Sequence, residues 1–288
     1  METVLTSKTR TVVISPERPF VIIGERINPT GRKKLAVEMA ALDMSRVRRD
    51  ALTQVAAGAH MLDVNAGVPA VDEAELLVAA VRAIMEVADV PLCLDSSVVE
   101  ALEAALPVVE GKPLVNSVTG EDERLERILP LVKKYGAAVI GMANDETGIS
   151  NDPQYRLGVA RKIVQRAQDY GIPPQDVVID PLALTVAADS QAVSLTLETM
   201  RLIRDELGVN MICGASNVSF GLPDRPAVNA AYLPLAMLCG LTCAITDPTV
   251  PIIYQSILAS DLLLGRDEYA VTWIAKFREK QRVVSSKQ

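Results

Sequence analysis

The chain has 288 residues, of which 49% are hydrophobic and only 3% are aromatic. This length suits one α/β domain, and an aliphatic core suits parallel strands that are buried on both faces. The formal charge of −7 opposes a nucleic-acid role, because such proteins normally present a basic surface to the phosphates. The single histidine, His60, leaves too few ligands for a histidine-based zinc site. The four cysteines lie in apolar runs, as core residues do.

Short apolar runs alternate with longer segments of helical period along the chain. Eight runs are expected to be strands: 20–24, 60–65, 91–95, 113–116, 138–142, 177–180, 209–214 and 242–246. Apolar residues at helical spacing mark several segments between them, namely 72–87, 121–134, 153–170 and 194–207. This alternation predicts a single (β/α)8 TIM barrel, a closed parallel sheet with outer helices. An open, doubly wound sheet is the alternative, but the turn after the first strand lacks the G-x-G-x-x-G pattern of that fold.

The ends of the chain and one uncharged stretch bear on its organisation. Residues 20–265 are expected to form the barrel, between an N-terminal extension at 1–19 and a C-terminal helix and tail at 266–288. The extension has no apolar core and does not look like a signal peptide, so a cytoplasmic location is expected. Residues 226–246 carry no charge and are about as long as a membrane span. Asn229, Pro234 and Gly240 interrupt this stretch, which favours a buried helix followed by a strand and no membrane association.

Polar side chains follow the apolar runs at six of the expected strand ends. They are Glu25 with Asn28, Asp63 with Asn65, Asp95, Asn116, Asp180, and Ser216 with Asn217. Barrel enzymes build their sites at the carboxyl ends of the strands, so these side chains are expected on one rim. Carboxylates and carboxamides together suit a neutral heterocycle that offers several N–H donors. Three alternatives stay open at this point, namely helix N-caps, a Mg²⁺ site, and an acid/base pair of Asp63 and Asp95.

The same motifs, in the same order, resemble the pterin-binding family. They are IGERIN at 23–28, LDVN at 62–65, LCLDS at 92–96, VNS at 115–117, IDP at 179–181 and GASNVS at 214–219. The chain looks most like the methyltetrahydrofolate–corrinoid methyltransferase branch, from about residue 20 to residue 265. This resemblance implies an enzyme that moves a methyl group between N5 of tetrahydrofolate and the cobalt of a corrinoid. The reduced folate is then a substrate, and the chain itself binds no metal.

The resemblance also implies which residues form the site. Three of them, Asp95, Asn116 and Asp180, are expected to hold the amino-pyrimidine edge of the pterin. Asn217 is expected close to N5 and is the expected catalytic residue. The remaining pocket residues are expected to be Gly214, Ser216 and Arg225. Four further residues match the family pattern without a defined role, namely Glu25, Asn28, Asp63 and Asn65.

Two missing motifs predict a partner. The D-x-H-x-x-G signature of a cobalamin-binding domain is not present, and no cysteine trio is available for zinc, so the corrinoid is expected on a separate protein. The family also implies a homodimer. Dihydropteroate synthases of the same superfamily carry a lysine in the seventh-strand motif, where this chain has Ser216 and Asn217. The absence of this lysine opposes synthase activity. A synthase-like transferase or a non-catalytic folate-binding barrel stays open as the alternative, and these residues do not fix the direction of methyl transfer.

Overall fold

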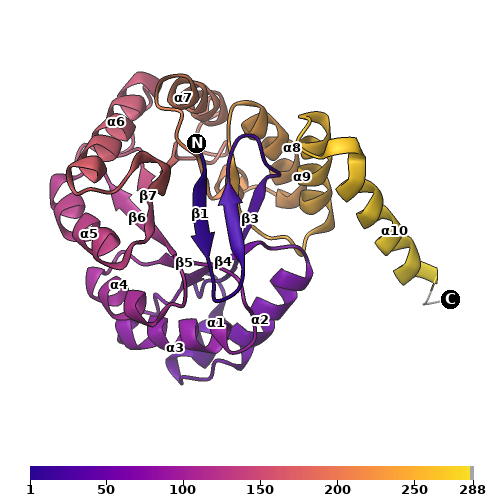
Figure 1. Cartoon of the computed structure of the whole chain (residues 1–288), viewed down its shortest axis with the longest axis horizontal. Helices are drawn as coiled ribbons and strands as arrows, with labels where there is room; N and C mark the ends of the chain where they lie inside the picture. The colour runs from indigo at the N-terminus through magenta and orange to yellow at the C-terminus, as the bar shows by residue number, and fades with distance from the viewer. Residues whose placement is uncertain (286–288) are drawn as a thin grey trace.

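The computed structural model describes residues 1–285 and is built around one curled parallel sheet (Figure 1). Seven strands follow the order β8–β7–β6–β5–β4–β3–β9, and neighbouring strands are parallel. These strands are β3 (Val21–Ile27), β4 (Met61–Asn65), β5 (Leu92–Asp95), β6 (Leu114–Thr119), β7 (Ala138–Met142), β8 (Val177–Asp180) and β9 (Cys243–Thr246). Helices cover the outer face, so the strands are buried on both sides and are continuous apolar runs.

Helices follow the strands in alternation, as the spacing of apolar residues predicts. They are α1 (Lys33–Ala40), α2 (Ser45–Ala56), α3 (Glu73–Met85), α4 (Val99–Ala105), α5 (Asp122–Tyr135), α6 (Pro153–Asp169), α7 (Ala192–Glu206), α8 (Arg225–Leu238), α9 (Pro251–Leu263) and α10 (Val271–Ser285). Short 3₁₀ turns occur at η1 (Leu106–Val108), η2 (Pro174–Asp176), η3 (Ala215–Ser219) and η4 (Glu268–Ala270). Local capping explains several boundaries: Asp72 and Asp152 accept backbone N–H groups at the start of α3 and α6, and Gly136 ends α5 in the left-handed conformation.

The structure differs from the predicted barrel at residues 209–214, the seventh expected strand. This segment forms only isolated parallel bridges, Ile179 with Met211 and Gly214 with Ile245. The Met211 N–H donates to the Thr242 hydroxyl at 3.1 Å, and the Met211 carbonyl accepts the N–H groups of both Thr242 and Cys243. A side-chain bond and a shared carbonyl thus replace the regular ladder at this point. The sheet shown has seven strands, and a closed ring of eight is not shown.

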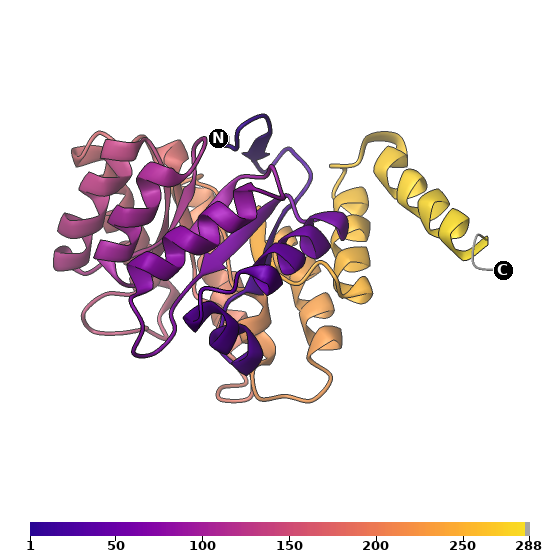
Figure 2. The same ribbon diagram turned by 90° about the horizontal axis from the view of Figure 1, so that it is seen from below.

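The N-terminal extension forms a hairpin of β1 (Thr3–Thr6) and β2 (Thr11–Ile14) that covers one end of the curled sheet (Figure 2). Its residues Leu5 and Ile14 are fully buried against the first residues of the parallel strands. The Asn210 carboxamide donates to the Thr3 hydroxyl and to the Ile14 carbonyl, both at 2.9 Å. The hairpin therefore closes the amino end of the sheet, and the carboxyl end is left for a site.

The uncharged stretch and the cysteines lie where the sequence predicts. Residues 226–246 form most of α8 and then β9, which are a helix and a strand rather than one continuous span. Across residues 1–285, no helix is both long and apolar enough to cross a membrane. All four cysteines are buried and unpaired. The last helix, α10, projects from the body of the molecule in both views (Figures 1 and 2).

Candidate active site

A cavity of about 460 Å³ opens at the carboxyl ends of the strands. Five of the predicted residues line it, namely Asp95, Asn116, Asp180, Gly214 and Asn217. They come from β5, β6 and β8, from η3, and from the residue directly before η3. Parallel strands deliver their terminal side chains to one edge, so residues that lie far apart in the chain meet here.

Two of the predicted residues lie behind the cavity and hold its lining. The Asn65 carboxamide donates to Asp95 Oδ2 at 3.0 Å, and strand register places these residues side by side. The Asn116 carboxamide donates to Asp63 Oδ1 at 3.2 Å. Neither Asp63 nor Asn65 lines the cavity. The polar strand ends therefore form two layers, and the inner layer satisfies and orients part of the outer one.

Burial sets the protonation of these carboxyl groups. It raises the pKa of Asp63 well above its usual range, and the nearby negative charge of Asp95 adds to the rise. Burial also raises the pKa of Asp95, partly offset by the hydrogen bond from Asn65. The pKa of Asp180 rises to about 6 for the same reason, although the Leu182 N–H donates to its Oδ1 at 2.8 Å. Asp180 is therefore mostly ionised at neutral pH and can accept N–H groups from a ligand.

Asn217 differs from the other polar lining residues at the strand ends in the freedom of its side chain. It belongs to η3, its backbone N–H donates to the Gly214 carbonyl at 3.1 Å, and its side chain is exposed to the cavity. Within the described residues, no hydrogen bond engages its carboxamide. Gly214 makes room for that group, because a Cβ on Gly214 would lie 3.0 Å from Asn217 Nδ2. The cavity thus presents one unengaged amide beside two carboxylates and a second carboxamide.

Three of the predicted residues do not line the cavity, namely Glu25, Ser216 and Arg225. The resemblance had implied that Ser216 and Arg225 are pocket residues. The Ser216 hydroxyl contacts both Glu25 carboxylate oxygens, at 2.9 and 2.8 Å. Arg225 donates to the Ser216 carbonyl at 2.7 Å and to the Ser219 hydroxyl at 3.1 Å. Burial raises the pKa of Glu25, and the Ser216 hydrogen bond lowers it again in part. These three residues fix the turn that carries Asn217.

Asn28 is also away from the cavity lining, in a local turn. Its Oδ1 accepts the Thr30 N–H at 2.9 Å, an arrangement that asparagine commonly adopts after a strand. Its contribution in this structure is to loop geometry.

Comparison with known proteins places the chain in a family. Residues 24–247 match the family model described as pterin binding enzyme. The chain belongs to the pterin-binding enzymes. A relative named methylcorrinoid:tetrahydrofolate methyltransferase, from Eubacterium limosum, is 30% identical over 268 residues, which cover 90% of this chain and 97% of the relative.

Solved structures with a similar fold include dihydropteroate synthases of low sequence identity. Dihydropteroate synthase from Xanthomonas albilineans in complex with 7,8-dihydropteroate has a TM-score of 0.67 at 18% identity, over 90% of this chain and 98% of that chain. The corresponding synthase from Thermus thermophilus has a TM-score of 0.65 at 22% identity, over 90% of this chain and 99% of that chain. At these identities the likeness establishes the fold alone. It agrees with an α/β architecture built on a curled parallel sheet.

Several further lining residues of this pterin-binding enzyme did not emerge from the sequence. They are Ser96, Ser97, Ser117, Thr119, Arg124, Ile140, Met142, Ile212 and Ile245. Ser96 and Ser117 are already the last residues of the LCLDS and VNS motifs, and Ser97 and Thr119 follow those motifs within two residues, so a short extension of each motif finds them. Arg124 lies on α5 and has no such signal; its guanidinium donates to the Ser97 carbonyl at 3.0 Å. It is the one cation among the described lining residues.

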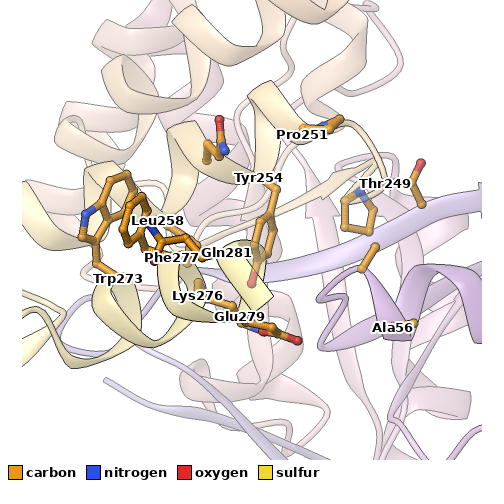
Figure 3. A pocket seen from close by; sticks show the side chains of 13 residues that line it. Ala56, Thr249, Pro251, Tyr254, Leu258, Trp273, Lys276, Phe277, Glu279 and Gln281 are labelled. Carbon is orange, nitrogen blue, oxygen red and sulfur yellow. The ribbon is translucent and has the colours of Figure 1, made fainter. Parts of the chain in front are cut away.

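A larger groove of about 1150 Å³ lies elsewhere, between α9, α10 and the end of α2 (Figure 3). Side chains of Tyr254, Leu258, Trp273 and Phe277 line it. None of the predicted site residues belongs to it. The labelled side chains that line this groove are mostly aromatic or aliphatic. The smaller cavity at the strand ends, in contrast, holds several polar groups that converge on one point, as enzyme active sites do.

Metal ligation has no support in the described part of the chain. Among residues 1–285, no group of three or more His, Cys, Asp or Glu side chains is arranged to hold a metal ion. Two of the acidic residues at the strand ends accept hydrogen bonds from carboxamides, in the Asn65–Asp95 and Asn116–Asp63 pairs.

Proposed function

We propose that this protein is a methyltransferase that moves a methyl group between N5 of tetrahydrofolate and the cobalt of a corrinoid carried by a separate protein. The observation that carries this proposal is the cavity itself, in which Asn217 offers a free carboxamide next to the carboxyl groups of Asp95 and Asp180. The 30% identity with a methylcorrinoid:tetrahydrofolate methyltransferase over nearly the whole chain supports it.

The cavity chemistry suits the pterin ring of a reduced folate. The amino-pyrimidine edge of that ring presents an exocyclic amine and ring N–H groups next to a carbonyl. In this proposal Asp95 and Asp180 accept the N–H groups, and the Asn116 carboxamide meets the remaining acceptor or donor. Ser216 and Arg225 act from behind, by holding the turn that carries Gly214 and Asn217. No phosphate-binding glycine-rich turn is needed for such a neutral ring.

The reaction needs control of one nitrogen. In the direction toward folate, the N5 lone pair forms the new N–C bond while the methyl–cobalt bond breaks. The electron pair of the broken methyl–cobalt bond stays on the cobalt, which becomes Co(I), and the N5 proton is released. The Asn217 carboxamide can accept a hydrogen bond from the N5 proton or donate one to its lone pair, so it can stabilise charge as it develops. Alignment of the two substrates supplies much of the remaining rate. The name of the Eubacterium limosum relative supports this direction.

The remaining features of the proposal concern organisation. We propose that residues 209–214 complete a barrel formed by 20–265, with the 1–19 hairpin as a cap and 266–288 as a C-terminal helix and tail. We also propose a cytoplasmic homodimer. Exposed apolar side chains on adjacent helices support self-association: Leu263 on α9, and Val271 and Phe277 on α10, are more than half exposed. Light scattering after gel filtration tests this, and a monomer at micromolar concentration would contradict it.

The test of activity uses free cobalamin in place of the corrinoid partner. Purified protein is mixed anaerobically with methylcob(III)alamin and tetrahydrofolate, and separately with cob(I)alamin and methyltetrahydrofolate. A folate-dependent change in the corrin absorbance supports the proposal, and the ratio of the two rates indicates direction. Tetrahydrofolate that binds in calorimetry without any methyl transfer, even to the native corrinoid protein, would favour a non-catalytic folate-binding protein. Condensation of a pterin pyrophosphate with 4-aminobenzoate would favour the synthase-like alternative.

A further inference from the structure

Arg156 is the largest of the fully buried side chains and lies on α6, outside the cavity. A guanidinium with no solvent exposure is unusual, because the loss of hydration must be balanced by hydrogen bonds or charge. Its Nη2 has no hydrogen-bond partner among residues 1–285, so the guanidinium is retained although its donors are incompletely satisfied. Such a residue calls for a role beyond packing.

The hydrogen bonds of Arg156 converge on the loops at the carboxyl end of the sheet. Its Nη1 donates to the carbonyls of both Pro181 and Leu182, each at 3.0 Å, and its Nε donates to the Ser150 carbonyl at 2.7 Å. Leu182 has a φ of +67°, a left-handed conformation that costs energy for a residue with a side chain. Arg156 therefore holds in place a turn that would otherwise relax.

That turn controls the Asp180 carboxylate. The Leu182 N–H donates to Asp180 Oδ1 at 2.8 Å, so the position of Leu182 sets the orientation of a cavity carboxylate. The Thr196 hydroxyl of α7 lies 3.0 Å from the same Leu182 carbonyl that Arg156 contacts and 2.9 Å from the Ala192 carbonyl, and these two carbonyls share its one proton. Side chains of α6 and α7 therefore both contact the Leu182 carbonyl, and the Leu182 N–H in turn holds the Asp180 carboxylate.

Arg156 is also the charge that favours ionised Asp180. The titratable groups that interact electrostatically with Asp180 are Arg156 from α6, Cys213 from the 209–214 segment, Tyr232 from α8 and Cys243 from β9. Burial raises the pKa values of the two thiols and the phenol, so these three groups are neutral near pH 7. The positive charge of Arg156 lowers the pKa of Asp180 and opposes the effect of burial.

We propose that Arg156 is a positioning residue for pterin recognition: by holding the 181–182 turn it fixes the Asp180 carboxylate in the orientation and charge state that accept the pterin N–H groups. This inference rests on the proposed function, because it assigns Asp180 the pterin edge. Arg156 itself touches no substrate.

The experiment measures tetrahydrofolate affinity by calorimetry between pH 5 and 8 for Arg156→Met, Arg156→Lys and Thr196→Val. Arg161→Met is the matched control, because Arg161 lies on the same helix but is exposed and pairs with Glu206. We expect Arg156→Met to weaken binding about tenfold at pH 7.5, and to shift the pH at which affinity is lost upward by about one pH unit. Arg156→Lys keeps the positive charge, and Thr196→Val replaces one neutral side chain with another. Both variants should therefore weaken binding by only a few-fold, with no shift in the pH at which affinity is half lost.

An Arg156→Met protein with the wild-type pH midpoint overturns the inference, even where it is less stable. If that variant does not fold, wild-type affinity in both Arg156→Lys and Thr196→Val overturns it instead. Hydrogen exchange of the peptide that spans residues 178–185 gives a readout independent of folate, and we expect faster exchange in both Arg156 variants than in Arg161→Met. Wild-type protein that binds no tetrahydrofolate refutes the proposed function, and in that case the exchange result alone decides whether Arg156 holds the turn.

Discussion

Replacement of Asp180 with asparagine separates what the site does for ligand binding from what it does for stability. The pKa of Asp180 rises from 3.8 to about 6 on folding, because burial disfavours the charged form. At 1.36 kcal/mol per pH unit, this rise means that the ionised side chain costs the folded state about 3 kcal/mol. Because part of the carboxylate faces the cavity and its water, this figure is an upper limit.

The sign follows from the direction of the pKa change. The folded protein holds the Asp180 proton to higher pH than the unfolded chain, so the contribution of Asp180 to the free energy of unfolding decreases as pH rises from 3.8 through 6. Asparagine has no such titration. The difference in free energy of unfolding between Asp180→Asn and wild type should therefore move in favour of the variant by up to about 2 kcal/mol as the pH is raised from 4.5 to 7. Tetrahydrofolate affinity should fall about 10- to 100-fold, because hydrogen bonds to a charged acceptor are lost.

Urea denaturation at both pH values, together with calorimetric titration of tetrahydrofolate, measures the two effects. Asp261 offers a matched control, since burial raises its pKa to about 6 as well and it lies on α9, away from the cavity. Asp261→Asn should show a similar pH-dependent change in stability without loss of folate affinity. A stability difference between Asp180→Asn and wild type that is the same at pH 4.5 and pH 7 would refute the argument about burial. Unchanged affinity would remove Asp180 from the site.

Three further substitutions test other parts of the molecule. Asn217→Ala should slow methyl transfer roughly 10²- to 10³-fold while folate affinity changes only a few-fold, and near-normal turnover in the cobalamin assay would contradict the catalytic assignment. Gly214→Ala introduces a Cβ 3.0 Å from Asn217 Nδ2 and should displace that amide, slowing transfer about tenfold; equal rates would mean that the amide position is not critical. Leu5→Ala removes a fully buried side chain of the hairpin and should lower the free energy of unfolding by about 3 kcal/mol, with folate affinity unchanged. A loss below about 1 kcal/mol in urea denaturation would show that the hairpin is not part of the core.

The sequence alone determined the local order of elements and the kind of residue at each strand end. An apolar run followed by Asp or Asn is a local pattern, and in parallel strands it fixes which end of the sheet becomes polar. Asp95, Asn116, Asp180 and Asn217 could be predicted as polar strand ends for this reason, and they line one cavity together with Gly214, which only the resemblance to the pterin-binding family implied. The alternation of strands with amphipathic helices likewise predicted the α/β class, because burial on both faces requires it.

Only the tertiary structure decided which polar side chains face the cavity and which face one another. Asn65 bonds Asp95, and Ser216 bonds Glu25 across 191 residues of chain, so these contacts depend on strand register and the curl of the sheet. Residues 209–214 read as a strand, yet their ladder is interrupted by the hydroxyl of Thr242, a side chain 31 residues from Met211. Arg156 shows no signal at all in the sequence, because an arginine within a helix is normally a surface residue. Its burial, and its distance from the substrate it is proposed to help recognise, follow from long-range packing that no local pattern encodes.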